Sequence, residues 1–377
     1  MKHSILAAAL SLGFTGALHA QSTEPVKIGI AVPLTGPAAV YAAGFKRGAD
    51  LAADEINAKG GILGGRKIQV VYEDDKGTPA GGVAAVQKLM VQDKVSAIGG
   101  GSGSSVVLAE TAITKNRILH MNSGAQADSL TEQDSPFLFT VQTVITSNSR
   151  SFNRFLIEKI KPKTVAFIGD NGEFSKKVLE VLTKDINTAG IKLVESSLYD
   201  AEIRDFTSIL TRIKAVDPDV LYVSDAYPAR SAQLWKQVRQ LGGFRTEVQS
   251  PGVLTPAALK AAGGSMEGVY SGDTYAPQLP EGTLGKKFVE DIRRLYNIEP
   301  GKEELVTYET IHVLADAMNK AGSDRDYPKL ANILRTATFT TPRGSFTFDK
   351  MGRAAWPVFY VQRVKGDQLT VVDTLRR

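Results

Sequence analysis

Residues 26–61 read VKIGIAVPLTGPAAVYAAGFKRGADLAADEINAKGG. The apolar, β-branched run 26–32 predicts a strand, and a loop rich in proline, glycine and alanine follows it. From Phe45 to Ile56 the apolar side chains recur on one helical face, and two glycines end the pattern. A second β-branched run, KIQVVYED at 67–74, comes next. A strand, a helix and another strand in this order predict a parallel pair crossed by the helix.

The alternation of strands and helices continues along the chain. Helical patterns separate the further strands, which we predict at 96–99, 117–122, 164–170, 191–199 and 219–225. In the tail, three helical patterns follow one another without intervening strands, at 281–296, 304–322 and 327–337. Two strand-like runs come after them, at 344–349 and 356–373, and the second contains a KGD turn. We predict an α/β fold with two doubly wound parallel-sheet units, whose strand-to-helix loops are the places for a ligand.

The amino terminus and the composition indicate where the protein works. Residues 1–20, MKHSILAAALSLGFTGALHA, have an early lysine, an apolar centre and a small final residue, which predicts a cleaved signal peptide. That centre is too short to span a membrane, and no later segment has the ~18 apolar residues that a span needs. The absence of cysteine excludes a lipid-anchor cysteine and thiolate metal ligands. Basic residues alternate with acidic ones, which excludes a nucleic-acid surface. We expect a periplasmic protein with no membrane insertion of the mature chain.

A glycine- and serine-rich turn, IGGGSGSS at 98–105, lies between a predicted strand and a predicted helix. It lacks the third glycine of a dinucleotide fingerprint, because Ser104 stands there, and it lacks the lysine of a phosphate-binding loop. Its free N–H groups and serine hydroxyls, at the start of a helix, suit a small anion such as a carboxylate. A tight connection that binds nothing is the alternative.

Catalytic groupings are nearly absent from the sequence. After the signal peptide only two histidines remain, His120 and His312, which without cysteine cannot build a common zinc site. No G-x-S-x-G elbow occurs. We therefore expect a binding protein without metal or cofactor. A nucleotide-dependent enzyme that uses the loop 99–105 is a remote alternative.

From Val26 to the last strands, the chain resembles the periplasmic solute-binding proteins of branched-chain amino-acid ABC transporters, the leucine-binding-protein-like group. The strand, the PLTGP loop, the helix, INAKGGI and the next strand follow the family's order and spacing, and AIGGGSGSS, ILHMNSGAQADSLT, TVAFIGDNGEF and GSFTFDKMG add to it. The resemblance implies two lobes joined by a three-crossing hinge, closing over one ligand, with an ABC permease of the inner membrane as partner. It implies an N-terminal lobe of 26–143 plus 274–352 and a C-terminal lobe of 144–273 plus 353–377.

The resemblance also implies which residues bind the ligand. From the first lobe they are Tyr41, Gly101, Ser102, Gly103, Ser104, Gly124, Ala125 and Gln126. Two of these depart from the family pattern, because Gly103 stands where serine is usual and Gln126 where a hydroxyl residue is usual. From the second lobe they are Phe174, Asp225, Tyr227 and Gly252.

The residue at 252 bears on the ligand class. Amino-acid binders of the family place an acid there to pair with the ligand ammonium, whereas this chain has Gly252. An unpaired buried ammonium costs several kcal/mol. The ligand is therefore expected to be a keto acid, an aromatic acid or another carboxylate without an ammonium. The alternative is an amino acid whose ammonium pairs with Asp225.

Overall fold

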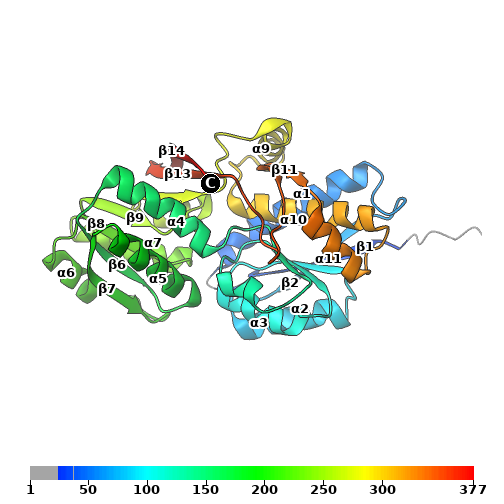
Figure 1. Cartoon of the computed structure of the whole chain (residues 1–377), viewed down its shortest axis with the longest axis horizontal. Helices are drawn as coiled ribbons and strands as arrows, with labels where there is room; N and C mark the ends of the chain where they lie inside the picture. Colours follow the sequence, from blue (N-terminus) through cyan, green and yellow to red (C-terminus); the bar gives the residue numbers. More distant parts are fainter. Residues whose placement is uncertain (1–23, 37) are drawn as a thin grey trace, which may run out of the picture.

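The computed structural model describes residues 24–36 and 38–377, which form two α/β lobes side by side (Figure 1). The predicted signal peptide, 1–20, lies outside the described residues. The first lobe contains a five-stranded sheet of order β2-β1-β3-β4-β5 with all neighbours parallel. Its strands are β1 (Val26–Val32), β2 (Ile68–Asp74), β3 (Ala97–Gly100), β4 (Leu119–Asn122) and β5 (Leu138–Thr140).

The second lobe contains a seven-stranded sheet of order β14-β13-β10-β9-β8-β6-β7. Its strands are β6 (Thr164–Asp170), β7 (Lys192–Tyr199), β8 (Val220–Ser224), β9 (Thr246–Gln249), β10 (Tyr270–Asp273), β13 (Val358–Lys365) and β14 (Gln368–Arg376). The sheet is parallel from β7 to β10, but β13 runs antiparallel to both β10 and β14. The sheets are thus predominantly parallel, as predicted, and β13 and β14 add an antiparallel edge to the second one. The turn between β13 and β14 is too short for the crossover that a parallel pair requires.

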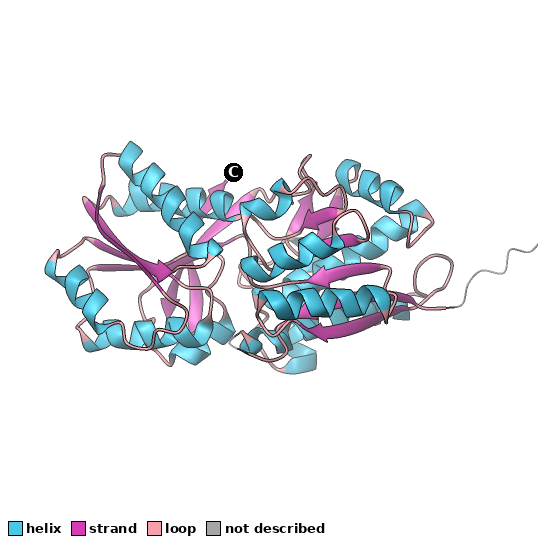
Figure 2. Cartoon of the chain, turned by 90° about the horizontal axis from the view of Figure 1, so that it is seen from below, coloured by secondary structure: helices cyan, strands magenta, loops and turns pink. Residues whose placement is uncertain are grey.

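Helices flank the strands of both lobes (Figure 2). Those of the first lobe are α1 (Ala42–Ala58), α2 (Pro79–Val91), α3 (Ser104–Thr114), α9 (Gly282–Tyr296), α10 (Lys302–Ala321) and α11 (Tyr327–Thr336), with the short turns η1 (Ala39–Tyr41) and η2 (Asp128–Glu132). Those of the second are α4 (Ile145–Phe155), continued by the π-helical turn η3 (Leu156–Ile160), α5 (Glu173–Thr188), α6 (Thr207–Ala215), α7 (Pro228–Gln240) and α8 (Pro256–Ala262). Within the described residues, no helix is both long and apolar enough to span a membrane.

The tail helices return to the first lobe, where α10 packs along α1 (Figure 1). Leu305 and Ile311 of α10 share one buried core with Ile28 of β1. The two helices approach so closely that a Cβ on Gly48 would lie 1.9 Å from the carbonyl oxygen of Glu304. Glycine is therefore required at position 48, and this close packing fixes α10 against the sheet edge where the candidate site lies.

The chain passes between the lobes three times, through 141–144, 274–281 and 347–357. The buried side chain of Arg343 ties these passages together, since it donates to Thr274 Oγ1 (2.9 Å) and to the carbonyl oxygen of Val141 (3.0 Å). Its guanidinium also lies 3.8 Å from the ring centroid of Trp356 and pairs with Glu309. One side chain thus links all three passages.

Several short strands have no counterpart among the sequence predictions. They are β5, β9, β10 and β11 (Phe339–Thr341). The predicted strand 344–349 appears only as β12 (Gly344–Phe346), which pairs with β11 in a two-stranded sheet. Runs of three or four residues are too short to show the alternation of apolar and polar side chains by which a strand is recognised.

Candidate functional site

The loops after β3 and β4 meet at the carboxyl edge of the first sheet. Gly101 has a φ of +79°, its N–H donates to Ala31 O (2.7 Å), and its own carbonyl accepts the N–H of Gly124 (2.9 Å). Asn122 holds the second loop, since it accepts the N–H of Ala125 (3.0 Å) and donates to the carbonyl oxygen of the same residue (2.7 Å). The N–H groups of Gly101, Gly124 and Ala125 are therefore bonded within the lobe and are not available to a ligand. These three residues shape the loops instead.

The start of α3 is different. Gly103 is the N-cap, with φ −89° and ψ 129°, and no side chain caps the helix. Among the described residues, the N–H groups of 102–105 have no hydrogen-bond acceptor, and neither have the hydroxyls of Ser102 and Ser104. Four free N–H groups at a helix N-terminus, where the helix dipole is positive, form a site that favours an anion.

Residues of the second lobe lie against these loops. Tyr41 Oη donates to the carbonyl oxygen of Ala226 (3.2 Å), and a Cβ on Gly103 would lie 3.7 Å from Tyr227 Oη. Gln126 Nε2 donates to the carbonyl oxygen of Gly252 (3.0 Å). These contacts bring the two lobes together on either side of the α3 N-terminus. In this arrangement the two lobes are in direct contact.

Gly252 has no room for a side chain. Its φ is +80°, and a Cβ there would lie 2.6 Å from both amide heteroatoms of Gln126. Asn148 fixes that amide by donating to Gln126 Oε1 (2.8 Å), and Lys302 Nζ donates to the same carbonyl of Gly252. The place expected to hold an acid in amino-acid binders is therefore filled by protein side chains.

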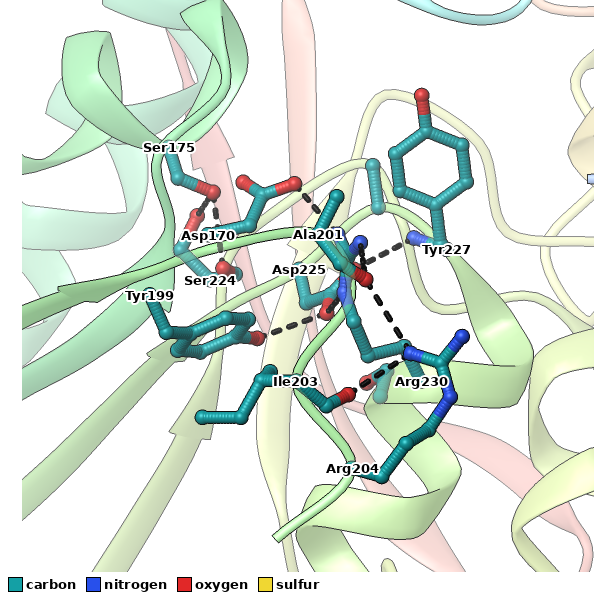
Figure 3. Close-up of polar contacts among 12 residues, drawn as sticks. Asp170, Ser175, Tyr199, Ala201, Ile203, Arg204, Ser224, Asp225, Tyr227 and Arg230 are labelled. Carbon is teal, nitrogen blue, oxygen red and sulfur yellow. Dashed lines mark hydrogen bonds and ion pairs between the residues drawn. The ribbon is translucent and has the colours of Figure 1, made fainter. Parts of the chain in front are cut away.

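Asp225 is the centre of a buried network (Figure 3). Arg230 donates through Nε to Asp225 Oδ2 (2.5 Å) and through Nη2 to Oδ1 (3.0 Å), and Nη2 also reaches Asp170 Oδ2 (2.5 Å). Tyr199 Oη and the N–H of Tyr227 complete the set, at 2.7 and 2.8 Å from the carboxylate of Asp225. Burial raises the pKa of Asp225, and Arg230 opposes that rise. Both oxygens are thus occupied by protein donors.

The same network positions Tyr227. The Arg230 guanidinium lies 4.8 Å from the centroid of the Tyr227 ring, in a cation–π arrangement. Arg230 was not predicted as a site residue, and neither were Tyr199 and Asp170. A sequence signal for Arg230 existed, because it follows Asp225 by five residues at the start of a helical pattern, but Tyr199 and Asp170 are remote in the chain.

Phe174 is 8% exposed and packs in an apolar cluster drawn from both lobes. Val107 and Ala125 of the first lobe belong to this cluster, together with Val253 of the second. Phe174 thus contributes to the closed interface through packing. Its predicted contact with a ligand stays a prediction.

A cavity of about 1030 Å³ opens between the lobes beside Tyr41. Gly44, Tyr275 and the start of α10 line it from one side and α8 from the other. Of the predicted site residues, Tyr41 alone is part of the described lining. The lining also contains Glu303, which is only 5% exposed and which the sequence prediction missed. Burial raises the pKa of Glu303 to about 7, with Lys302 opposing.

The two remaining histidines lie outside this interface. His120 is buried in the first lobe, where Nδ1 lies 3.0 Å from Thr114 Oγ1, and burial lowers its pKa to about 4. His312 lies on α10 with Nε2 3.5 Å from Glu55. Among the described residues, no group of three or more histidine, aspartate or glutamate side chains could hold a metal ion.

Curated proteins with similar sequences are binding proteins. The chain is 30% identical over 351 residues to an amino acid binding protein of Pseudomonas aeruginosa, covering 91% of each chain. It is 29% identical over 348 residues to the Leu/Ile/Val-binding protein BraC3 of Rhizobium johnstonii, again covering 91% of each.

Solved structures with the same fold include proteins with different ligands. The leucine binding protein LivK of Thermotoga maritima aligns with a TM-score of 0.86 at 24% identity, covering 93% of this chain and 99% of that one. A solute binding protein of an ABC transporter from R. palustris, in complex with benzoate, aligns with a TM-score of 0.85 at 20% identity, covering 93% and 96%. The family model described as periplasmic binding protein matches residues 25–368. This chain therefore belongs to the periplasmic binding protein family.

Proposed function

We propose that this protein is the ligand-binding component of an ABC importer and that it captures a small organic carboxylate between its lobes. The observation that carries the proposal is the start of α3, where the N–H groups of 102–105 have no acceptor among the described residues. They lie opposite Tyr227, at an interface that both lobes form. The amino-acid-binding relatives and the benzoate-bound structure support a carboxylate, because each of those ligands carries one.

The contacts support a separate role for each predicted residue. Ser102, Gly103 and Ser104 hold the carboxylate, and Gly101, Gly124 and Ala125 shape the loops around it. Tyr41 and Tyr227 cover the ligand, and Phe174 packs the closing interface. Gln126 and Gly252 join the lobes by a hydrogen bond. Asp225 anchors Arg230 and, through it, Tyr227.

Asp225 is therefore a poor partner for a ligand ammonium. Its two oxygens already accept bonds from Arg230, Tyr199 and the N–H of Tyr227, and an ammonium would have to displace one of them. Gly252 offers no charge either. The carboxylate is thus the defining feature of the ligand, and any further polar group must be recognised elsewhere.

Binding and release follow from the two-lobe architecture. The contacts between Tyr41 and Ala226, and between Gln126 and Gly252, exist only when the lobes are closed. A ligand that touches both lobes shifts the population toward this closed form, since it has more contacts there than in an open form. An ABC permease would then distinguish closed from open protein. No bond in the ligand is broken.

Two further expectations belong to the same proposal. The lobes comprise 26–143 plus 274–352 and 144–273 plus 353–377, supported by the positions of the three passages. Residues 1–20 are a cleaved signal peptide, so the mature protein works in the periplasm. A nucleotide site in the loop 99–105 is not part of the proposal.

Identification of the bound ligand tests the proposal. Protein purified from the periplasm is denatured, and the released small molecules are identified by mass spectrometry. Stripped and refolded protein is then screened by thermal shift against amino, keto, hydroxy and aromatic acids, with ATP and NAD as the enzyme control. Stabilisation by a carboxylate is the expected result, and stabilisation by a nucleotide alone would refute the proposal.

A further inference from the structure

The side-chain amide of Gln126 is bonded on both sides by groups of the second lobe. Its Oε1 accepts a hydrogen bond from Asn148 Nδ2 (2.8 Å), and its Nε2 donates to the carbonyl oxygen of Gly252 (3.0 Å). Asn148 Oδ1 in turn accepts a hydrogen bond from Nη2 of Arg377 (2.9 Å). These four residues form a polar row, which runs from the Arg377 guanidinium through two amides to the Gly252 carbonyl.

The middle of the polar row is shielded from water. Asn148 is 0% exposed, Gln126 is 4% exposed, and Gly252 is buried. Arg377 lies at the surface, but its guanidinium reaches inward, where Nε also donates to Ser151 Oγ of α4 (2.8 Å). The guanidinium is thus fixed against the same helix that carries Asn148.

The two ends of the polar row decide the direction of every hydrogen bond in it. A guanidinium can only donate, and a carbonyl oxygen can only accept. Asn148 must therefore turn its oxygen to Arg377 and its NH₂ group to Gln126. Gln126 must then turn its own NH₂ group to Gly252. Reversal of either amide would bring like groups face to face at a buried place, where water cannot replace the lost bonds.

The carbonyl at the end of the polar row is itself fixed. The N–H of Gly252 donates to the carbonyl oxygen of Gly272 (2.8 Å), which holds its loop against β10. Lys302 of the first lobe donates to the same carbonyl of Gly252 that Gln126 reaches. Two side chains of the first lobe thus converge on one backbone oxygen of the second. Both bonds stabilise the form in which the lobes are joined, and neither involves a ligand.

We infer that Arg377 and Asn148 are positioning residues for lobe closure, which orient the Gln126 amide so that it joins the first lobe to Gly252. This inference rests on the proposed function, in which closure of the lobes captures the ligand. It differs from the expectation that Gln126 contacts the ligand, because bonds between protein groups favour the closed form equally for every ligand. A variant that closes less readily therefore binds each ligand more weakly by the same factor.

Asn148→Asp tests the direction of the polar row, because it keeps the size of the side chain and replaces the NH₂ group by an acceptor oxygen. Gln126 must then reverse, which turns its Oε1 toward the carbonyl of Gly252. The probes are leucine, 2-hydroxy-4-methylpentanoate, 4-methyl-2-oxopentanoate and benzoate, titrated by calorimetry on stripped, full-length protein. Each probe that binds the wild type should bind Asn148→Asp about tenfold more weakly, by the same factor for all. Stopped-flow fluorescence should show the loss as faster dissociation, with the association rate little changed.

Matched variants separate closure from stability. Asn153→Asp makes the same change at another fully buried position of α4, where it faces Asp185, and it should lower the melting temperature without altering affinity. Arg377→Met removes the donor at the surface end and should weaken all probes by one factor, even if Asn148→Asp folds poorly. Arg377→Lys, which also can only donate, should bind like the wild type. In a Gln126→Met background, Asn148→Asp should change affinity little, because no amide is left to reverse.

The outcomes distinguish this inference from the proposed function. If carboxylates bind but Asn148→Asp and Arg377→Met bind them as tightly as the wild type does, the inference is wrong and the proposed function stands. The same holds if the loss is confined to some of the probes, since Gln126 would then contact the ligand, or if Asn148→Asp costs as much affinity without Gln126 as with it. If none of the probes binds the wild type, the proposed function is wrong and the inference falls with it.

Discussion

The proposed role of the free N–H groups at the start of α3 can be tested at Ser104, the first residue of that helix, where a single substitution removes one N–H group. Proline is favoured at this position of a helix, where its missing N–H has no intrahelical role. Gly103 already has the extended ψ of 129° that a residue before proline prefers. Ser104→Pro therefore removes one N–H donor with little strain on the backbone. Ser104→Ala is the matched control, because it removes the hydroxyl and keeps the N–H.

The magnitude follows from the bond that is lost. A hydrogen bond to a charged group contributes ~1.5–3 kcal/mol, and each 1.4 kcal/mol is a factor of ten in Kd. We expect Ser104→Pro to weaken ligand binding by roughly 10- to 150-fold relative to Ser104→Ala. The melting temperature of the empty protein should hardly change, because the N–H of Ser104 has no acceptor among the described residues.

Titration calorimetry on ligand-stripped protein measures the two affinities, and a thermal melt without ligand checks the fold. The comparison of proline with alanine isolates the N–H from the hydroxyl. If Ser104→Pro binds as tightly as Ser104→Ala while both melt like the wild type, the carboxylate does not lie at this helix end. The placement of the site at residues 102–105 would then be wrong.

Three other predictions concern closure, the buried network and pH. Phe174→Ala should destabilise the closed form, because the Phe174 side chain belongs to an apolar cluster drawn from both lobes. X-ray scattering of the ligand-loaded variant should therefore show less compaction than that of the wild type. If the variant and the wild type are equally compact at the same ligand saturation, Phe174 packs only within its own lobe. Asp225→Asn should destabilise the protein by ~3–5 kcal/mol in urea denaturation, since it leaves Arg230 short of a buried partner; unchanged stability with selective loss of amino-acid binding would instead assign Asp225 to the ammonium. Burial raises the pKa of Asp75 to about 6 in the folded protein, above its ordinary value of 3.8. The protonated side chain therefore stabilises the fold below about pH 4, and this contribution is lost as the pH rises to about 6. The loss should reach ~3 kcal/mol at 1.36 kcal/mol per pKa unit, and urea denaturation at pH 4 and pH 7 should show a smaller pH dependence in Asp75→Asn; an equal dependence in both proteins would contradict this.

The sequence predicted the long elements and the two α/β units well, because their cores follow simple periodicities. The strand 26–32 and the helices that became α9, α10 and α11 are examples. The apolar face of each helix and the β-branched runs of each long strand are local properties. The short strands β5, β9 and β10 carry too few residues for such a pattern, and their place in the sheets comes from pairing with neighbours.

The candidate site was harder to predict, because its electrostatics depend on residues that are distant in the chain. Asp225 could be found from the sequence, but whether its charge is free depends on Arg230, Asp170 and Tyr199. Glu303 precedes the predicted helix 304–322, so the sequence pattern places this acid in a loop. Its burial arises only when α10 packs on α1 and α8 comes across from the other lobe.

The interleaving of the two lobes has a consequence for how the chain folds. The first core needs α10, and the second sheet needs β13, which lies between β10 and β14 and supplies the buried Phe359 and Val361. Both cores therefore depend on contacts between segments far apart in sequence, whose loop-closure entropy makes folding slow. An emerging polypeptide cannot complete the first core before α10 and Trp356 have been synthesised, or the second before β13. A chain of this kind is expected to fold more slowly than one whose cores form from neighbouring segments.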